Sequence, residues 1–155
     1  MKKSGFLFKS ATGIVVLLVL FAFKTSTNND IKKIDFYADP SMKGKVMVLV
    51  KEELAAGRKP VLFFTATWCG PCRQFKNSLS NILMIDALKG STLILIDGDI
   101  DAKSDKIAAK YDVSAYPTFV RVNEQGELIK KTDGGAWEEN IPENMAPVMK
   151  KFMKD

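Results

Sequence analysis

The 155-residue chain contains no histidine and only two cysteines. Both cysteines lie in residues 68–72 (Trp-Cys-Gly-Pro-Cys), separated by two residues. Cysteines at this spacing usually exchange disulfides or supply half of a zinc site. A tetrahedral zinc site would lack its remaining cysteine or histidine ligands, and a c-type haem attachment would need a histidine where the chain has Arg73. Disulfide exchange is the chemistry that remains.

The residues around the two cysteines favour a reactive thiolate. Residues 61–65 have the apolar pattern of a buried strand, which would place Cys69 in the first turn of the following helix. Free backbone N–H groups and the helix dipole stabilise an anion there, and Pro71 is tolerated in a first helical turn. Arg73 adds a positive charge beside the pair. Cys72, one turn deeper, would then attack a mixed disulfide formed at Cys69 and release the reduced substrate.

Several patterns have a structural explanation beside a functional one. A Cys69–Cys72 disulfide that never turns over would add little stability, because the loop that it closes is very short. Residues 97–101 (Asp-Gly-Asp-Ile-Asp) look like the start of a calcium loop, but Ala108 replaces the glutamate needed at its twelfth position, so a solvated loop is expected. Trp137 is expected to be packed. The regularly spaced Met145, Met149 and Met153 are expected to pack in the core rather than to bind a soft metal.

Three features together resemble the thioredoxin family. Residues 68–72 are similar to the active-site signature of that family. Residues 116–118 (Tyr-Pro-Thr) are similar to its cis-proline segment, which lies opposite the dithiol and holds the substrate backbone. A proline that simply opens a strand would give the same pattern. Residues 134–135 (Gly-Gly) resemble the glycine that flanks the substrate groove, and the resemblance extends over roughly residues 34 to 155.

This resemblance implies a thiol-disulfide oxidoreductase that uses its cysteine pair and needs no further cofactor or metal. Cys69 is expected to be the nucleophile and Cys72 the resolving cysteine. Active-site support is expected from Trp68, Gly70, Pro71 and Arg73. Substrate binding is expected from Tyr116, Pro117, Thr118 and Gly134.

The expected fold is α/β, a thioredoxin fold in which helices flank a central mixed sheet on both faces of a single domain. Its expected strands are residues 34–37, 60–66, 92–97, 118–122 and 127–131. Helices are expected from about residue 39 to 56, from the dithiol to Gly90, over residues 103–111, and at the C-terminus. The second helix should bury Phe75, Leu79, Ile82 and Leu83. The last should bury Ile141, Met145, Val148, Met149 and Phe152.

The amino terminus follows the pattern of a secretory signal. Lys2, Lys3 and Lys9 precede an uncharged run over residues 11–23, which Lys24 closes. This run is short for a membrane-spanning helix, which needs about 20 apolar residues. No clean cleavage site follows, so a cleaved signal and a retained anchor both stay open.

Three segments are therefore expected along the chain. Residues 1–27 form a signal peptide or N-terminal membrane anchor, residues 28–33 a polar linker, and residues 34–155 the thioredoxin-like domain. The four lysines of the leader account for most of the formal net charge of +5, so no nucleic-acid partner is indicated. We expect a monomer that is periplasmic or otherwise extracytoplasmic, with membrane association possible through residues 6–23.

One departure from the family concerns proton transfer. Cytosolic thioredoxins carry a buried aspartate six residues before the first cysteine, where this chain has Phe63. The lysine that usually faces it is also absent, because residues 93–96 are apolar. A buried thiol without such a base resists deprotonation. Cys72 is expected to depend on water, on Thr65 or Thr67, or on the bound substrate.

The direction of electron flow is indicated by the dipeptide between the cysteines. Gly-Pro at positions 70–71 resembles the reducing members of the family, which lie near about −270 mV. An exported reductase needs a supply of electrons because its surroundings would otherwise oxidise it. A membrane electron donor is therefore expected, with protein thiols and disulfides as substrates. The alternatives are a disulfide oxidase or isomerase, and a non-catalytic peptide-binding or metal-handling module.

Overall fold

The computed structural model describes residues 30–154, and a five-stranded sheet forms its centre. The strand order is β1-β3-β2-β4-β5, in which β1 and β2 run parallel to β3, and β4 runs antiparallel to β2 and β5. The strands are β1 (Lys32–Asp35), β2 (Lys59–Thr65), β3 (Ser91–Asp97), β4 (Thr118–Val122) and β5 (Leu128–Asp133). The expected mixed sheet is confirmed, with boundaries that differ by one or two residues.

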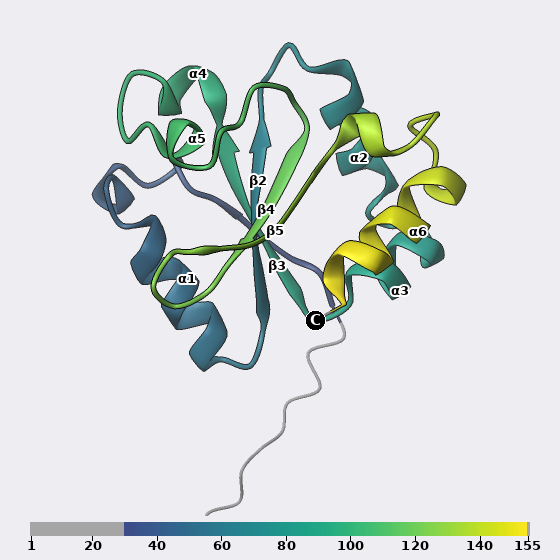
Figure 1. Cartoon of the computed structure of the whole chain (residues 1–155), viewed down its shortest axis with the longest axis horizontal. Helices are drawn as coiled ribbons and strands as arrows, with labels where there is room; N and C mark the ends of the chain where they lie inside the picture. Colours follow the sequence, from purple (N-terminus) through teal and green to yellow (C-terminus); the bar gives the residue numbers. More distant parts are fainter. Residues whose placement is uncertain (1–29, 155) are drawn as a thin grey trace, which may run out of the picture.

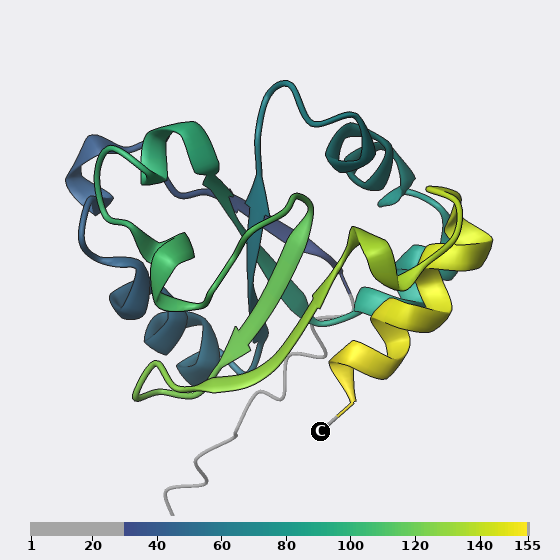
Figure 2. The ribbon, with the colours of Figure 1, turned by 45° about the horizontal axis from the view of Figure 1, so that its top comes forward.

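Helices cover both faces of this sheet, as Figure 1 shows. One face carries α1 (Val46–Ala55), α4 (Gly98–Asp101) and α5 (Ile107–Lys110), together with the short 3-10 helix η1 (Pro40–Met42). The other carries α2 (Gly70–Ser78), α3 (Ile82–Leu88) and α6 (Pro142–Met153), with the 3-10 helix η2 (Gly134–Ala136) before α6. Both views place α3 alongside α6 (Figures 1 and 2). The expected three-layer thioredoxin fold is confirmed.

The central strand β2 separates two hydrophobic cores. Val61 and Phe63 pack with the residues of α2, α3 and α6, whereas Leu62 and Phe64 pack with those of α1 and α5. All four side chains are at most 1% exposed. Successive side chains of a strand point to opposite faces, so a strand that is covered on both faces must be apolar throughout.

The chain after the dithiol forms two helices, α2 and α3, where a single helix was expected. The prediction of its buried residues is therefore wrong in part. α2 ends at Ser78, and Asn81 caps α3 by accepting a hydrogen bond from the backbone N–H of Leu83 at 2.9 Å. This restart turns Ile82 and Leu83 outward, where they are 72% and 44% exposed. Met84 and Leu88 of α3 fill the core in their place.

The aspartates after β3 form a capped turn rather than the expected solvated loop. Asp97 caps α4 by accepting from the backbone N–H groups of Asp99 and Ile100. Asp101 is fully buried and accepts from Tyr37 Oη and from the N–H groups that begin α5. The helix predicted over residues 103–111 begins later, because Lys106 has a left-handed backbone with φ of 53°.

The terminal helix packs its methionines as expected. Met145, Met149 and Met153 are at most 6% exposed and belong to the core beneath α2, where Phe152 joins them. Ile141, however, is the N-cap residue of α6 and is 41% exposed. It precedes the first turn and so does not share the buried face.

A buried ionic network lies at the end of the sheet where β1, β2 and β3 begin. Arg58 donates from Nε to Thr92 Oγ1 at 2.7 Å and from Nη1 to Asp30 Oδ1 at 3.1 Å. Thr92 donates in turn to Glu53 Oε2 at 2.6 Å, and Lys32 pairs with the other oxygen of Glu53. The network joins α1 to the first residues of β1 and β3.

The predicted leader, residues 1–27, lies outside the described residues. The first strand begins at Lys32, inside the segment predicted as a linker. Among residues 30–154, no helix is long and apolar enough to cross a membrane.

Candidate active site

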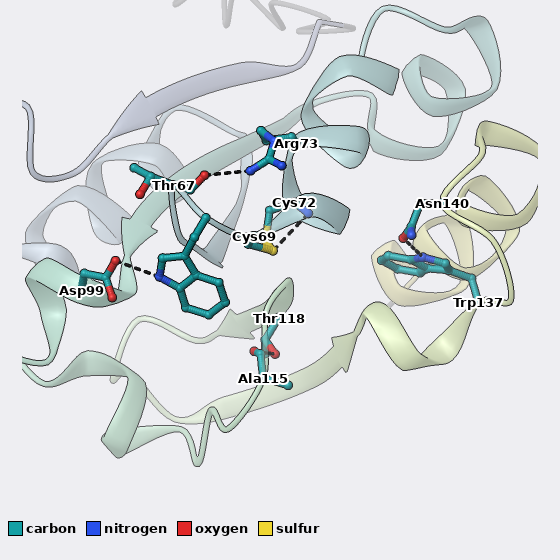
Figure 3. Close-up of a disulfide and its surroundings, with 10 residues drawn as sticks. Thr67, Cys69, Cys72, Arg73, Asp99, Ala115, Thr118, Trp137 and Asn140 are labelled. Atoms are coloured by element: carbon teal, nitrogen blue, oxygen red, sulfur yellow. Dashed lines mark hydrogen bonds between the residues drawn. A yellow bond between two sulfur atoms is a disulfide. The ribbon is translucent and has the colours of Figure 1, made fainter.

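The two cysteines open helix α2 and are joined by a disulfide. Their sulfur atoms are 1.97 Å apart and their Cα atoms 5.3 Å apart. Cys69 is the N-cap residue of α2, and its Sγ accepts a hydrogen bond from the backbone N–H of Cys72 at 3.2 Å (Figure 3). Pro71 stands in the first turn, where its missing N–H has no helical partner to lose. The backbone N–H of Cys72 is therefore already directed at the sulfur of Cys69.

The two cysteines differ in their surroundings. Cys69 retains 3% of its surface, whereas Cys72 is fully enclosed. Both belong to the core between the sheet and helices α2, α3 and α6, together with Phe63 and Phe75. Attack on a sulfur requires access to it, and of the two cysteines only Cys69 has any exposed surface.

Arg73 and Trp68 flank the dithiol on separate elements. Arg73 donates from Nη1 to the carbonyl oxygen of Thr67 at 2.9 Å, which joins the start of α2 to the loop before it. Trp68 is 65% exposed, and its Nε1 donates to Asp99 Oδ2 of α4 at 3.0 Å (Figure 3). Asp99 was not predicted as a site residue.

The Tyr116–Pro117 peptide bond is cis and lies in the loop that precedes β4. The ring of Tyr116 is centred 5.8 Å from the ring of Trp68 and packs so closely on Gly98 that a Cβ atom there would lie 2.0 Å from its hydroxyl oxygen. Burial, and then the negative charge of Asp101 and its neighbouring aspartates, raise the pKa of Tyr116. Tyr116 therefore carries a neutral phenol at neutral pH.

Pro117 is buried and held from two sides. Its carbonyl oxygen accepts a hydrogen bond from the N–H of Gly134 at 2.9 Å. The hydroxyl of Thr118 donates back to the carbonyl oxygen of Ala115 at 2.7 Å and closes the turn (Figure 3). The structure thus brings the predicted residues of the Tyr-Pro-Thr segment and Gly134 together beside the dithiol.

This arrangement of a helix-opening dithiol and a facing cis-proline agrees with the comparisons. The family model described as Thioredoxin matches residues 45–147. The chain belongs to the thioredoxin family. It is a thiol-disulfide oxidoreductase whose redox centre is the Cys69–Cys72 pair, and the family needs no cofactor besides that pair.

Individual thioredoxins show the same likeness. The TPR repeat-containing thioredoxin TDX of Arabidopsis thaliana is 31% identical over 118 residues, which are 75% of this chain but only 29% of that protein. Thioredoxin-1 of Drosophila melanogaster is 31% identical over 98 residues, 63% of this chain and 86% of its own length. A disulphide isomerase structure from Xylella fastidiosa Temecula1 has 25% identity and a TM-score of 0.54, covering 71% of this chain and 92% of its own.

Phe63 occupies the position of this thioredoxin site at which cytosolic thioredoxins carry a buried aspartate. Phe63 is fully buried and stacks on Phe119, with ring centres 4.8 Å apart, while Phe75 packs against it at 5.2 Å. Trp137, as expected, is packed rather than exposed, and donates from Nε1 to Asn140 at 2.9 Å. The surroundings of the inner sulfur are therefore aromatic.

Only one buried hydroxyl group lies in the strand segment that leads to this thioredoxin dithiol. Thr65 ends β2, is 6% exposed, and its Oγ1 has no hydrogen-bond partner. Thr67, in the loop between β2 and Cys69, is exposed. In the part of the chain that the structure describes, no group of three or more potential metal ligands lies together.

Proposed function

We propose that this thioredoxin-family protein is a disulfide reductase that works outside the cytoplasm on protein disulfides. The observation that carries the proposal is the asymmetry of the dithiol. Cys69 caps α2 and retains 3% of its surface, whereas Cys72 is fully buried behind it. One cysteine can therefore meet a substrate disulfide while the other waits to resolve it.

The reaction has two thiol-disulfide exchanges. The Cys69 thiolate attacks one sulfur of the substrate disulfide, which breaks that bond and releases the first substrate sulfur as a thiolate. Cys72 then gives up its proton to water and attacks Cys69, and the second substrate sulfur leaves as a thiolate that takes up a proton from water. Two electrons have passed to the substrate, and the protein ends with the Cys69–Cys72 disulfide.

The substrate is proposed to lie in the space that Trp68, Tyr116 and the cis-proline segment border. Trp68 offers an exposed ring, and Tyr116 stands beside it with a neutral hydroxyl. Gly134 donates to the carbonyl oxygen of Pro117, and the Thr118 hydroxyl donates to that of Ala115 and closes the turn. By resemblance to the family, an extended segment that flanks the substrate disulfide binds here.

Export is supported by the N-terminal sequence, in which three lysines precede the uncharged run over residues 11–23. A reductase outside the cytoplasm is kept active only if electrons are supplied to it. We therefore propose a membrane-bound dithiol donor that reduces the Cys69–Cys72 disulfide. The Gly-Pro dipeptide at positions 70–71 favours the reducing direction.

A disulfide isomerase is the second candidate, because the disulphide isomerase from Xylella fastidiosa has a similar fold with a TM-score of 0.54. An isomerase would rearrange a scrambled protein substrate without a net change in its thiols. A reductase would release two substrate thiols for each protein disulfide formed. Counting thiols in a single turnover separates the two.

Trapping tests the order of the two exchanges. In the full-length protein, Cys72→Ser should accumulate a mixed disulfide between Cys69 and a model protein disulfide, whereas Cys69→Ser should form none. Accumulation in Cys69→Ser and not in Cys72→Ser would reverse the assignment.

The location is tested in intact cells with a membrane-impermeant maleimide, which should label Cys69 after reduction. No labelling until the cells are lysed would contradict export.

A further inference from the structure

Three buried side-chain oxygen atoms within residues 30–154 have no hydrogen-bond partner: Thr65 Oγ1, Ser91 Oγ and Asp105 Oδ2. The Thr65 side chain is the one that ends β2, at the point where the chain enters the dithiol loop. An unpaired buried hydroxyl destabilises a folded protein. Such a group therefore calls for an explanation in another state of the molecule.

The strand geometry places the Thr65 side chain on the face of the sheet that carries the dithiol. Val61 and Phe63 both pack in the core that contains Cys72. Side chains two residues apart on a strand point the same way, so Thr65 shares their face. Leu62 and Phe64, which alternate with them, pack in the opposite core.

The register places Thr65 at the same level as the site. It pairs with Asp97 of β3, directly before α4. On its other side, β2 pairs with the antiparallel strand β4, and Phe64 lies opposite Thr118. Continuing this register by one residue places Thr65 opposite Pro117. Pro117 in turn bonds Gly134 through its carbonyl oxygen. Thr65 thus lies level with Pro117, at the end of β2 from which the chain continues to Cys69.

Within residues 30–154, each buried charged side chain is bonded to groups other than Cys72. Phe63, two residues before Thr65 on β2, is fully buried, and its ring stacks on the ring of Phe119. Glu53 and Arg58 pair at the opposite end of the sheet, and Asp101 is bonded to α5 and Tyr37 on the other face. Arg121 of β4 donates to the carbonyl oxygens of Phe152 and Lys154 at the C-terminal end of α6. A thiolate formed at Cys72 would be costly in such apolar surroundings.

We propose that the Thr65 hydroxyl donates a hydrogen bond to the sulfur of Cys72 once the disulfide is open. The bond stabilises the Cys72 thiolate as it attacks Cys69 in the mixed disulfide. Cys72 first gives its thiol proton to water. Its electron pair then forms the new S–S bond, the bond from Cys69 to the substrate breaks, and the substrate thiolate takes up a proton from water. Thr65 itself neither gains nor loses a proton. This proposal rests on the resolving role proposed for Cys72.

The test follows the mixed disulfide in a single turnover of the full-length protein with a model protein disulfide, quenched with acid and separated by mass. Thr65→Val removes the hydroxyl and keeps the branched shape. Thr65→Ser keeps the hydroxyl. Ser91→Ala is the matched control, because it removes another unpaired buried hydroxyl at the far end of β3.

Thr65→Val should slow the decay of the mixed disulfide by about tenfold, the size of a hydrogen bond to a charged group, and move the midpoint of its pH–rate profile upward. Formation of the mixed disulfide should be unchanged. Thr65→Ser and Ser91→Ala should decay like the wild type. If Thr65→Val folds poorly, Thr65→Ala gives the same comparison.

Two results would overturn the proposal. The first is a Thr65→Val or Thr65→Ala protein that resolves at the wild-type rate with an unchanged pH midpoint. The second is a Thr65→Ser protein as slow as Thr65→Val, which would indicate a role in packing. A wild-type protein that forms no mixed disulfide at all would instead contradict the proposed function, so the two failures are distinguishable.

Discussion

The carbonyl oxygen of Pro117 accepts a hydrogen bond from the N–H of Gly134 at 2.9 Å, and a Cβ atom on Gly134 would lie only 2.9 Å from Cδ of the same proline. The start of η2 therefore packs directly on the cis-proline. No other residue type leaves room for this contact, so the position of Pro117 beside the dithiol depends on a missing side chain.

Gly134→Ala should displace Pro117 and lower both stability and activity. Overpacking of this kind typically costs about 1–3 kcal/mol of unfolding free energy. We expect a lower kcat/KM for a protein disulfide, with most of the loss in KM because the substrate-facing segment has moved. Thermal unfolding and steady-state kinetics measure the two effects.

Gly135→Ala is the matched control. The added Cβ atom would meet only Oδ1 of Asp133, at 3.1 Å, and a side chain can move aside. A Gly134→Ala protein as stable and as active as Gly135→Ala would show that the contact with Pro117 does not matter.

Phe63→Ala should be among the most destabilising changes in the domain. The Phe63 ring is fully buried between Phe75 and Phe119, and removing such a ring costs about 3–5 kcal/mol. Denaturant unfolding of the oxidised protein measures the loss. A loss below about 1 kcal/mol would contradict the packing described for the region below Cys72.

Much of the fold was predictable because β2 and β3 are apolar on both faces and the dithiol marks the helix after β2. The faces of the helices were less predictable. Ile82 and Leu83 fit a continuous helix, and only the capping bond of Asn81 turns them outward. Ile141 fits the apolar stripe of α6 but precedes its first turn.

The site was predictable where a motif marks it and hidden where tertiary contacts create it. Asp99 of α4 accepts a hydrogen bond from the indole of Trp68 in the loop before α2, and no local pattern indicates that pairing. Asp101 lies in a run of aspartates typical of solvated loops, yet it is buried because α5 offers it free N–H groups. The unpaired state of the Thr65 hydroxyl depends on packing that sequence does not report.

Stability at acid pH should depend on Glu53. Burial alone would raise its pKa, but hydrogen bonds from Lys32 and Thr92 and the charge of Arg58 together hold the pKa below the ordinary 4.5. A carboxyl whose pKa is lowered by folding adds stability above its unfolded pKa and loses it as the pH falls through the folded one. The loss should therefore begin near pH 4.5 and continue below it.

Glu53→Gln should reduce the unfolding free energy at pH 7 by about 1.5–3 kcal/mol, the range for hydrogen bonds to charged groups. Its stability should also fall less steeply below pH 4.5 than that of the wild type. Glu52→Gln, an exposed neighbour on α1, is the control and should behave like the wild type. Identical acid profiles for Glu53→Gln and the wild type would contradict this role.

The contact between Trp68 and Asp99 should influence substrate binding. Asp99→Leu removes the acceptor of the indole N–H, so the exposed ring is no longer held beside the dithiol. We expect kcat/KM for a protein disulfide to fall by about two- to fivefold, the size of one exposed hydrogen bond. Asp99→Asn keeps an acceptor oxygen and should stay near the wild type. Equal activities for the two variants would argue against the contact.

The equilibrium reduction potential of the Cys69–Cys72 pair in the full-length protein tests the proposed function most directly. Equilibration with glutathione or dithiothreitol buffers, read by the fraction of free thiols, gives the value. A reductase supplied by a membrane donor should lie near about −250 mV or lower. A potential above about −180 mV would contradict that direction and indicate an oxidase or isomerase.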